Sequence, residues 1–318
     1  MRATLIRWPI ALLASLHLLS AQGTVPTFDC QAGHHYSILG GDLRRGTNTT
    51  VPTVLVPITL AFDAKKIGGK PFIMDAAADV PRVLTSPIFA DFPFANGRTQ
   101  YVDAMLRATF ANASGHTLLG RPSVKPITIG IPIGYGYVLT SKQSGRSFAI
   151  ADLEYVQREI FKQIARQDGS LIIAVTRNTA FYALGDATVC CAWGTHGVDT
   201  ASGNSFVLAS YLQSAPSVVE DQDVQPLTMQ LAEFANDPLH DPLARGGRNA
   251  AVAGNTVPGW MRPGFPGACG GAGVGSTYFL LQPTNTNPKN NIPASKAFVA
   301  AAGGVSYHLQ NAALLPWY

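Results

Sequence analysis

Few side chains in this sequence have the types and spacing that acid–base or metal chemistry requires. The segment 228–238, TMQLAEFANDP, has helical spacing, carries one carboxylate at Glu233 and stops at Pro238. Met229 and Glu233 are four residues apart and would share one face of that helix. A carboxylate placed there could bind a metal or move a proton, or it could pair with a base such as Arg245 or Arg248.

Histidines are the next candidates, because imidazole can move protons and bind metals at neutral pH. The ones worth weighing are His34, His35, His196, His240 and His308. A single histidine is more often a hydrogen-bonded structural group than a ligand. His196 follows Cys190-Cys191-Ala192-Trp193, where a strand should give way to a loop, so it is the candidate cleft residue.

Other catalytic patterns are not supported. The glycine-rich run 267–277 contains no lysine and follows a proline-rich loop, which argues against a phosphate-binding loop. The run 194–197, GTHG, has no central serine and therefore no nucleophile elbow. No Ser/His/Asp arrangement is forced by the chain, so a serine hydrolase has no specific support.

Four cysteines, Cys30, Cys190, Cys191 and Cys269, form an even set. An even count in an exported protein favours disulfides. Adjacent cysteines rarely bridge to each other, so we expect one of the neighbouring pair to reach Cys269. The other would reach Cys30 or stay buried. No CxxC pair is present, which argues against a cysteine zinc site.

The elements that must position these groups follow from hydrophobic periodicity. Asp152 is a suitable N-cap for the clearest helix, 152–167, and a buried strand follows that helix closely. Prolines 52 and 57 in the first strand indicate an edge position or a break. The expected strands cover 51–62, 171–175 and 205–212, with a strand or hairpin over 124–139, and the expected helices cover 99–110, 152–167, 224–237 and 305–315.

Composition indicates a loop-rich globular protein of strands with a few helices. Apolar residues make up 47% and charged residues 13%, with 31 Gly and 22 Pro. The expected fold class is therefore α+β, a mixed sheet packed by a few helices, with a loop-rich C-terminal part. One domain over 22–318 is expected, and the alternative has two lobes, 22–222 and 223–318. Scattered basic residues give no support for a nucleic-acid partner.

Residues 1–21 have the plan of a secretory signal peptide. Arg2 and Arg7 precede an apolar run from Ile10 to Leu19, and small residues follow. Cleavage after Ala21 would leave 21 Lys and Arg against 19 acids, since two of the 23 basic residues are lost. A retained anchor is the alternative. No later segment is apolar over membrane length, so the mature protein is expected to be soluble and secreted or periplasmic.

Several segments together resemble a family of secreted, mostly uncharacterised bacterial proteins whose central helix reads HEIAEWxNDP. A more distant likeness is to the plant phosphate-induced (exordium-type) proteins. Both helices are similar to that of zinc peptidases, which implies a zincin-like fold. The matching pieces are VPTVLVPITLAF, SPIFADFPFANGRTQYVDAMLRATF, HTLLG (116–120), Cys190 to Gly197, LAEFANDP, VPGW (257–260) and HLQNAALLPW.

The resemblance assigns chemical roles that this chain does not keep. In such a helix a histidine and a residue four positions later bind Zn²⁺, and the glutamate beside the histidine activates water. Here those positions hold Met229, Glu233 and Gln230, and the later carboxylate positions align with Gly273 and Ser276. A thioether is a poor zinc ligand, and a neutral amide cannot accept a proton from water.

Three functional hypotheses follow. The first is a secreted zincin-like protein without metal or cofactor, working by binding or in an envelope role. The second is an active secreted hydrolase, with a zinc site rebuilt from Glu233 and His196, His240 or His308, or with a metal-free mechanism. The third is a carbohydrate- or cell-wall-binding protein that uses Trp193, Trp260, Tyr135 and Tyr137. The sequence does not identify a partner or an oligomeric state.

Overall fold

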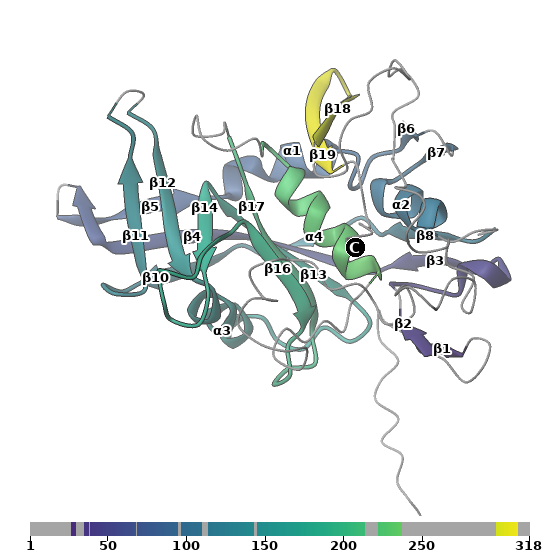
Figure 1. Cartoon of the computed structure of the whole chain (residues 1–318), viewed down its shortest axis with the longest axis horizontal. Coiled ribbons are helices and arrows are strands. Elements are labelled where there is room, and N and C mark those ends of the chain that lie inside the picture. Colours follow the sequence, from purple (N-terminus) through teal and green to yellow (C-terminus); the bar gives the residue numbers. More distant parts are fainter. Residues whose placement is uncertain are drawn as a thin grey trace, which may run out of the picture.

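The computed structural model describes residues 27–29, 35–37, 39–67, 69–94, 97–109, 114–142, 145–213, 222–236 and 297–310. Within these ranges the protein is mixed α and β, with four α-helices and a majority of strands (Figure 1). None of the described helices is long and apolar enough to cross a membrane. The predicted signal peptide, residues 1–21, lies outside the described ranges.

Strands and helices alternate irregularly along the described part of the chain. The strands are β1 (Thr27–Asp29), β2 (His35–Ser37), β3 (Asn48–Val51), β4 (Thr53–Ile67), β5 (Lys70–Asp75), β6 (Phe92–Phe94), β7 (Gly97–Thr99), β8 (His116–Leu119), β9 (Ser123–Val124), β10 (Ile127–Ile131), β11 (Gly136–Thr140), β12 (Ser147–Asp152), β13 (Leu171–Arg177), β14 (Thr179–Tyr182), β15 (Cys190–Ala192), β16 (Gly194–Val198), β17 (Ser205–Tyr211), β18 (Ala297–Ala302) and β19 (Val305–Gln310). The helices are the 3₁₀ turns η2 (Leu43–Arg45) and η3 (Ala77–Asp79) and the α-helices α1 (Val80–Thr85), α2 (Tyr101–Thr109), α3 (Leu153–Gln163) and α4 (Gln225–Asn236).

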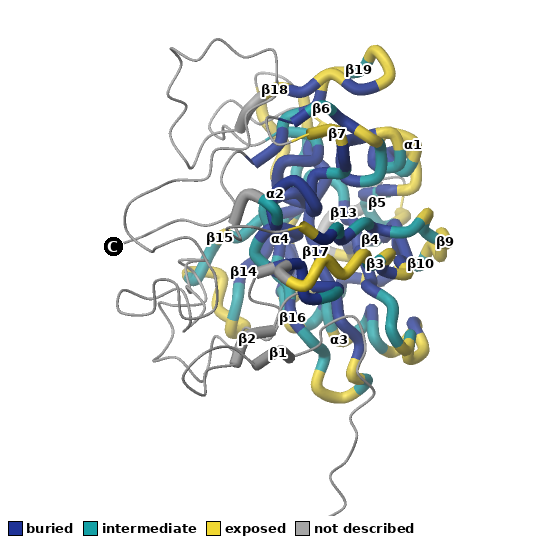
Figure 2. The backbone as a smooth tube through the Cα atoms, turned by 90° about the vertical axis from the view of Figure 1, so that its right-hand side faces the viewer, coloured by how far each residue is buried: buried dark blue, intermediate teal, exposed yellow. Residues whose placement is uncertain are grey.

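A seven-stranded sheet forms the centre of the protein. Its main order is β10-β4-β13-β17-β16, and β5 and β9 also pair with β4. β13 runs parallel to both β4 and β17, whereas β16 lies antiparallel to β17 at the edge. Every residue of β17 and all but one of β13 are buried (Figure 2). Such continuous burial is typical of parallel strands covered on both faces, and it explains the apolar sequences LIIAV and SFVLAS.

The two faces of this sheet bury two different hydrophobic clusters. Ile173, Val175 and Val207 belong to the cluster that contains the apolar residues of α2 and α4. The alternate residues, such as Ile172 and Leu208, belong to the cluster that contains those of α3. Because successive side chains of a strand point to opposite faces, α4 and α3 cover opposite faces of the sheet.

The predicted helices 152–167 and 224–237 are confirmed as α3 and α4. The Asp152 side chain accepts a hydrogen bond of 2.7 Å from the Tyr155 backbone N–H, as an N-cap should. The predicted core stripe of α4, Leu227, Leu231 and Phe234, is fully buried. Helix α2 likewise forms where the periodicity of 99–110 predicted a helix.

The edge position predicted from the two prolines is wrong for β4. Pro52 does break the chain between β3 and β4, but β4 is paired along both sides. Pro57 is the last β4 residue paired with β13, and the pairing with β5 begins at Thr59. On the other side β10 begins to pair only at Ile58. The missing N–H of Pro57 therefore falls where β4 changes partners.

Two further expectations are corrected. Residues 305–310 form strand β19, which pairs with β18 as a hairpin, instead of the first turns of a helix over 305–315. The alternate burial of Tyr307 and Leu309 has the period of a strand. For residues 124–139, the strand alternative is confirmed by β10 and the hairpin alternative is wrong. β10 joins the large sheet beside β4, whereas β11 begins a four-stranded sheet of order β11-β12-β14-β15.

Candidate functional site

The candidate site lies where α4 crosses the edge strand β16. His196 is paired with Val207, and Gly194 is paired with Ala209. Both β17 partners face the α4 cluster. Side chains directly opposite each other in a ladder share a face of the sheet, so the register turns His196 toward α4. The sequence signal for His196 was only its place after Trp193. The register of β16 supplies the reason that it reaches the helix.

His196 contacts two polar side chains of α4, Gln230 and Glu233. Its Nδ1 lies 2.9 Å from Gln230 Oε1 and 3.6 Å from Glu233 Oε2. The imidazole is 9% exposed and the Glu233 side chain is 24% exposed. The His196 ring also packs edge-on against Phe234, with 6.2 Å between ring centres. The structure thus brings His196 to two positions of the α4 motif, Gln230 and Glu233, which the sequence indicated separately from His196.

Gly194 allows this close crossing. A Cβ atom at this position would lie 2.4 Å from the Leu208 carbonyl oxygen and 2.9 Å from Gln230 Cγ. Both distances are far below a normal van der Waals contact, so any larger residue would push β16 away from β17 and from α4. The glycine therefore sets the separation at which Gln230 and His196 meet.

The Glu233 carboxylate also acts on the fully buried Tyr101 of α2. Burial first, and then the negative charge of Glu233, raise the pKa of the Tyr101 phenol above its ordinary value. The Tyr101 hydroxyl donates a hydrogen bond of 2.9 Å to the Gln310 carbonyl. The Gln310 N–H in turn donates to the Thr228 hydroxyl. These bonds join α4 and α2 to β19.

The donor set does not fit a zinc site of the predicted kind. Met229, at the first ligand position, offers only a thioether, and Glu233 is the only anionic ligand on α4. The Gln230 amide oxygen is engaged by His196 and, being neutral, cannot serve as a general base. The aligned carboxylate positions, Gly273 and Ser276, lie outside the described residues.

Among the described side chains, two other histidines, His308 and His116, are paired with carboxylates other than Glu233. His308 Nδ1 lies 2.8 Å from Asp223 Oδ2, and its backbone N–H donates to the same carboxylate. His116 Nδ1 lies 2.9 Å from the buried Asp103. His34 and His240, together with the predicted partners Arg245 and Arg248 of Glu233, lie outside the described residues. In the described ranges, no three His, Cys, Asp or Glu side chains are grouped as a metal site would need.

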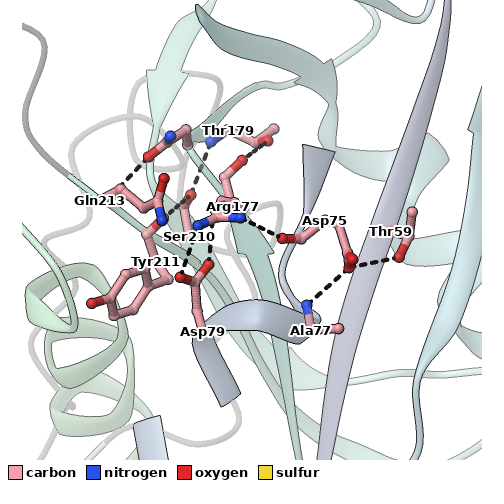
Figure 3. A network of polar contacts seen from close by, with 10 residues as sticks. Thr59, Asp75, Ala77, Asp79, Arg177, Thr179, Ser210, Tyr211 and Gln213 are labelled. Carbon is pink, nitrogen blue, oxygen red and sulfur yellow. Dashed lines mark hydrogen bonds and ion pairs between the residues drawn. The ribbon is translucent and has the colours of Figure 1, made fainter. Parts of the chain in front are cut away.

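A second polar cluster, which the sequence reasoning missed, lies at the end of β13 (Figure 3). Arg177 Nη2 donates to Asp79 Oδ1 at 3.3 Å, and its Nε lies 3.2 Å from Asp79 Oδ2. Arg177 also donates to the Asp75 carbonyl. Burial raises the pKa of Asp79 to about 6, and the charge of Arg177 offsets only part of that effect. The two partners are 98 residues apart, so no local pattern joins them.

The described residues include only two of the four cysteines in the predicted disulfides, Cys190 and Cys191. The Sγ atoms of Cys190 and Cys191 lie in contact with each other in β15. Chain connectivity alone holds these neighbours close. Cys30 and Cys269 lie outside the described residues, so a bridge from the neighbouring pair to Cys269 stays a prediction.

Comparisons of the chain with protein-family models, with curated proteins and with solved structures found no match. The resemblance to zincin-like secreted proteins therefore rests on the sequence segments alone.

Proposed function

We propose that this chain is a secreted, zincin-like protein that performs no zinc-dependent hydrolysis and acts by binding, in the periplasm or outside the cell. The observation that carries the proposal is the hydrogen bond between His196 Nδ1 and Gln230 Oε1. An amide oxygen only accepts, so this contact places a proton on Nδ1. The hydrogen bond therefore occupies Nδ1 and leaves only Nε2 for a metal, and it holds a neutral amide, which cannot activate water, at the position where the resemblance implies a general base.

The contacts of α4 support a structural role for its polar residues. Gln230 is buried and held between His196 and the close approach at Gly194. Glu233 is placed to pair with His196 whenever the imidazole is protonated. The apolar residues of the helix remain those of a packed core element. The packing side of the helix is thus retained while its reactive positions carry Met229 and Gln230.

Metal analysis of the mature protein, residues 22–318, tests this proposal. After dialysis against a weak chelator, we expect well below one zinc per chain and no cleavage of casein or of a fluorogenic peptide library. The Met229→His/Gln230→Glu double variant restores a ligand next to Glu233 and removes the amide that holds His196. We expect its zinc affinity to exceed that of the natural chain at least tenfold.

Adding Glu233→Gln to the double variant is the matched control, and it should abolish the gain because one anionic ligand is lost. Stoichiometric zinc in the unmodified chain would overturn the proposal and favour the rebuilt hydrolase site. Peptide cleavage that persists in chelator and disappears in His196→Ala would also overturn it, because a metal-free mechanism would then operate.

A further inference from the structure

The described surface contains a pocket on the opposite side of the sheet from α4. It has a volume of about 420 Å³ and lies between α3 and the turn that joins β16 to β17. Pockets of roughly 300–1,000 Å³ are the usual size for small-molecule sites. The lining residues are Glu154, Gln157, Arg158, Phe161, Lys162, Asp199, Ala201 and Ser202.

The wall opposite α3 is held rigidly. Asp199 Oδ2 accepts hydrogen bonds from the Ser202 N–H at 2.7 Å and from the Ser202 hydroxyl at 2.6 Å. The Asp199 and Asn204 backbones bond each other, and Asn204 Oδ1 accepts from the Gln167 N–H beyond the end of α3. The turn and the helix are therefore fixed relative to each other before any ligand arrives.

The pocket has an aromatic residue among polar groups. Phe161 is half-buried and packs edge-on against Phe206, with 5.1 Å between ring centres. The Gln157 amide and Asp199 Oδ1 make no hydrogen bond to any described part of the chain. Three kinds of polar group thus surround the Phe161 ring. The Gln157 amide donates and accepts, the Asp199 carboxylate oxygen accepts, and the Arg158 guanidinium donates.

The charges of the lining select against a strongly charged ligand. Arg158 and Lys162 are opposed by Glu154 and Asp199 within the pocket. Glu159, also on α3, lies 2.7 Å from Lys162 Nζ and 3.6 Å from Arg158 Nε. With the positive groups matched by carboxylates, no excess positive charge is left to attract a phosphate or another anion.

An aromatic surface continues from the rim of the pocket. The Arg158 guanidinium lies 5.1 Å from the centre of the Tyr155 ring, and the Tyr155 ring lies 4.6 Å from the ring of Tyr135. Tyr135, just before β11, is 43% exposed, and Tyr137, within β11, is 44% exposed. These two tyrosines were named in the carbohydrate hypothesis, and their side chains lie at the surface rather than in the core.

We propose that the pocket between α3 and the β16–β17 turn binds a neutral saccharide, and that an attached sugar unit extends over Tyr135. Sugar hydroxyls both donate and accept, as the mixture of Gln157, Arg158 and Asp199 requires, and the apolar face of a pyranose packs on an aromatic ring. The proposal rests on the binding role proposed above, because it names the class of ligand that would be bound. Its residues are separate from those of α4.

Saturation-transfer NMR and calorimetric titration of the mature chain test the site. The probes are cellotriose, triacetylchitotriose and maltotriose with their monosaccharides, and free glycine and phenylalanine as zwitterions. We expect millimolar or tighter binding of at least one trisaccharide. The Gln157→Ala/Arg158→Ala variant should weaken it at least tenfold, whereas Lys142→Ala, an exposed cation on the β11–β12 turn, should leave it unchanged.

Tyr135→Ala should weaken the trisaccharide more than its monosaccharide, because only the longer ligand reaches the aromatic surface. Absence of saccharide binding at millimolar concentration would overturn the proposal. Binding that the Gln157→Ala/Arg158→Ala variant leaves intact, or binding of the free amino acids in place of sugars, would also overturn it. Zinc in the unmodified chain would refute the role proposed for α4 and would leave the result at this pocket unaffected.

Discussion

Replacing Gly194 with alanine should destabilise the protein and disrupt the contact between His196 and Gln230. The added methyl group would lie 2.4 Å from the Leu208 carbonyl oxygen and 2.9 Å from both Ala209 Cβ and Gln230 Cγ. Two of these neighbours belong to the central strand β17, which is buried throughout and cannot retreat. The strain must therefore be relieved mainly by displacing the edge strand β16 from β17 and α4, which moves His196 away from Gln230.

The cost has two parts. Overpacking of a buried site costs typically about 1–3 kcal/mol. Loss of the His196–Gln230 hydrogen bond adds about 1 kcal/mol. A decrease of about 2–4 kcal/mol in the free energy of unfolding is expected, which should lower the Tm of a chain of this size by about 2 °C or more per kcal/mol.

Chemical denaturation and thermal unfolding of the mature chain measure this effect, with Gly130→Ala as the matched control. Gly130 also lies in a strand of the large sheet, and a Cβ there meets no atom within 4 Å. Its replacement should be neutral or slightly stabilising, by less than about 1 kcal/mol. The His196 ring resonances should shift in Gly194→Ala only. Equal stability of the two variants, with unchanged His196 resonances, would refute the close-approach argument.

Two other predictions concern single carboxylates. The pKa of Asp79 is raised from 3.8 to about 6 in the folded protein, so the folded state binds more protons than the unfolded state between these pH values. The free energy of unfolding should therefore fall as the pH rises through this window, by up to about 3 kcal/mol. Urea denaturation between pH 3.5 and 7 should show this decrease in the natural chain and in the control variant Asp91→Asn, whose carboxylate is exposed. Asp79→Asn should not show it, and an unchanged pH dependence in that variant would contradict the assignment. Asp152→Ala removes the acceptor of the Tyr155 N–H and should cost about 1 kcal/mol, whereas Asp152→Asn, which keeps an acceptor, should cost a few tenths. Equal losses in the two Asp152 variants, measured by denaturation, would argue against the capping role.

The elements predicted correctly are those whose apolar spacing is complete within one short segment. Helix α3 has an apolar stripe and a capping aspartate within one segment, and β13 has a continuous apolar run after it. The helix predicted over 305–315 was wrong for β19, because this strand has few apolar residues to show its period. Its structure depends on pairing with β18 in a hairpin, and the spacing of its own residues does not show that pairing. When the apolar spacing of a short segment fits both a helix and a strand, its structure is decided by the segment that it pairs with.

The sequence by itself determined that α4 is a packed amphipathic helix and that Met229 and Gln230 are unsuited to zinc chemistry, because these properties belong to residue types and helical spacing. Tertiary structure alone decided that His196 meets Gln230 and Glu233. That meeting depends on the antiparallel register of β16 with β17 and on the closeness that Gly194 permits. The Asp79–Arg177 pair and the pocket beside α3 depend in the same way on long-range packing, which the order of residues along the chain does not display.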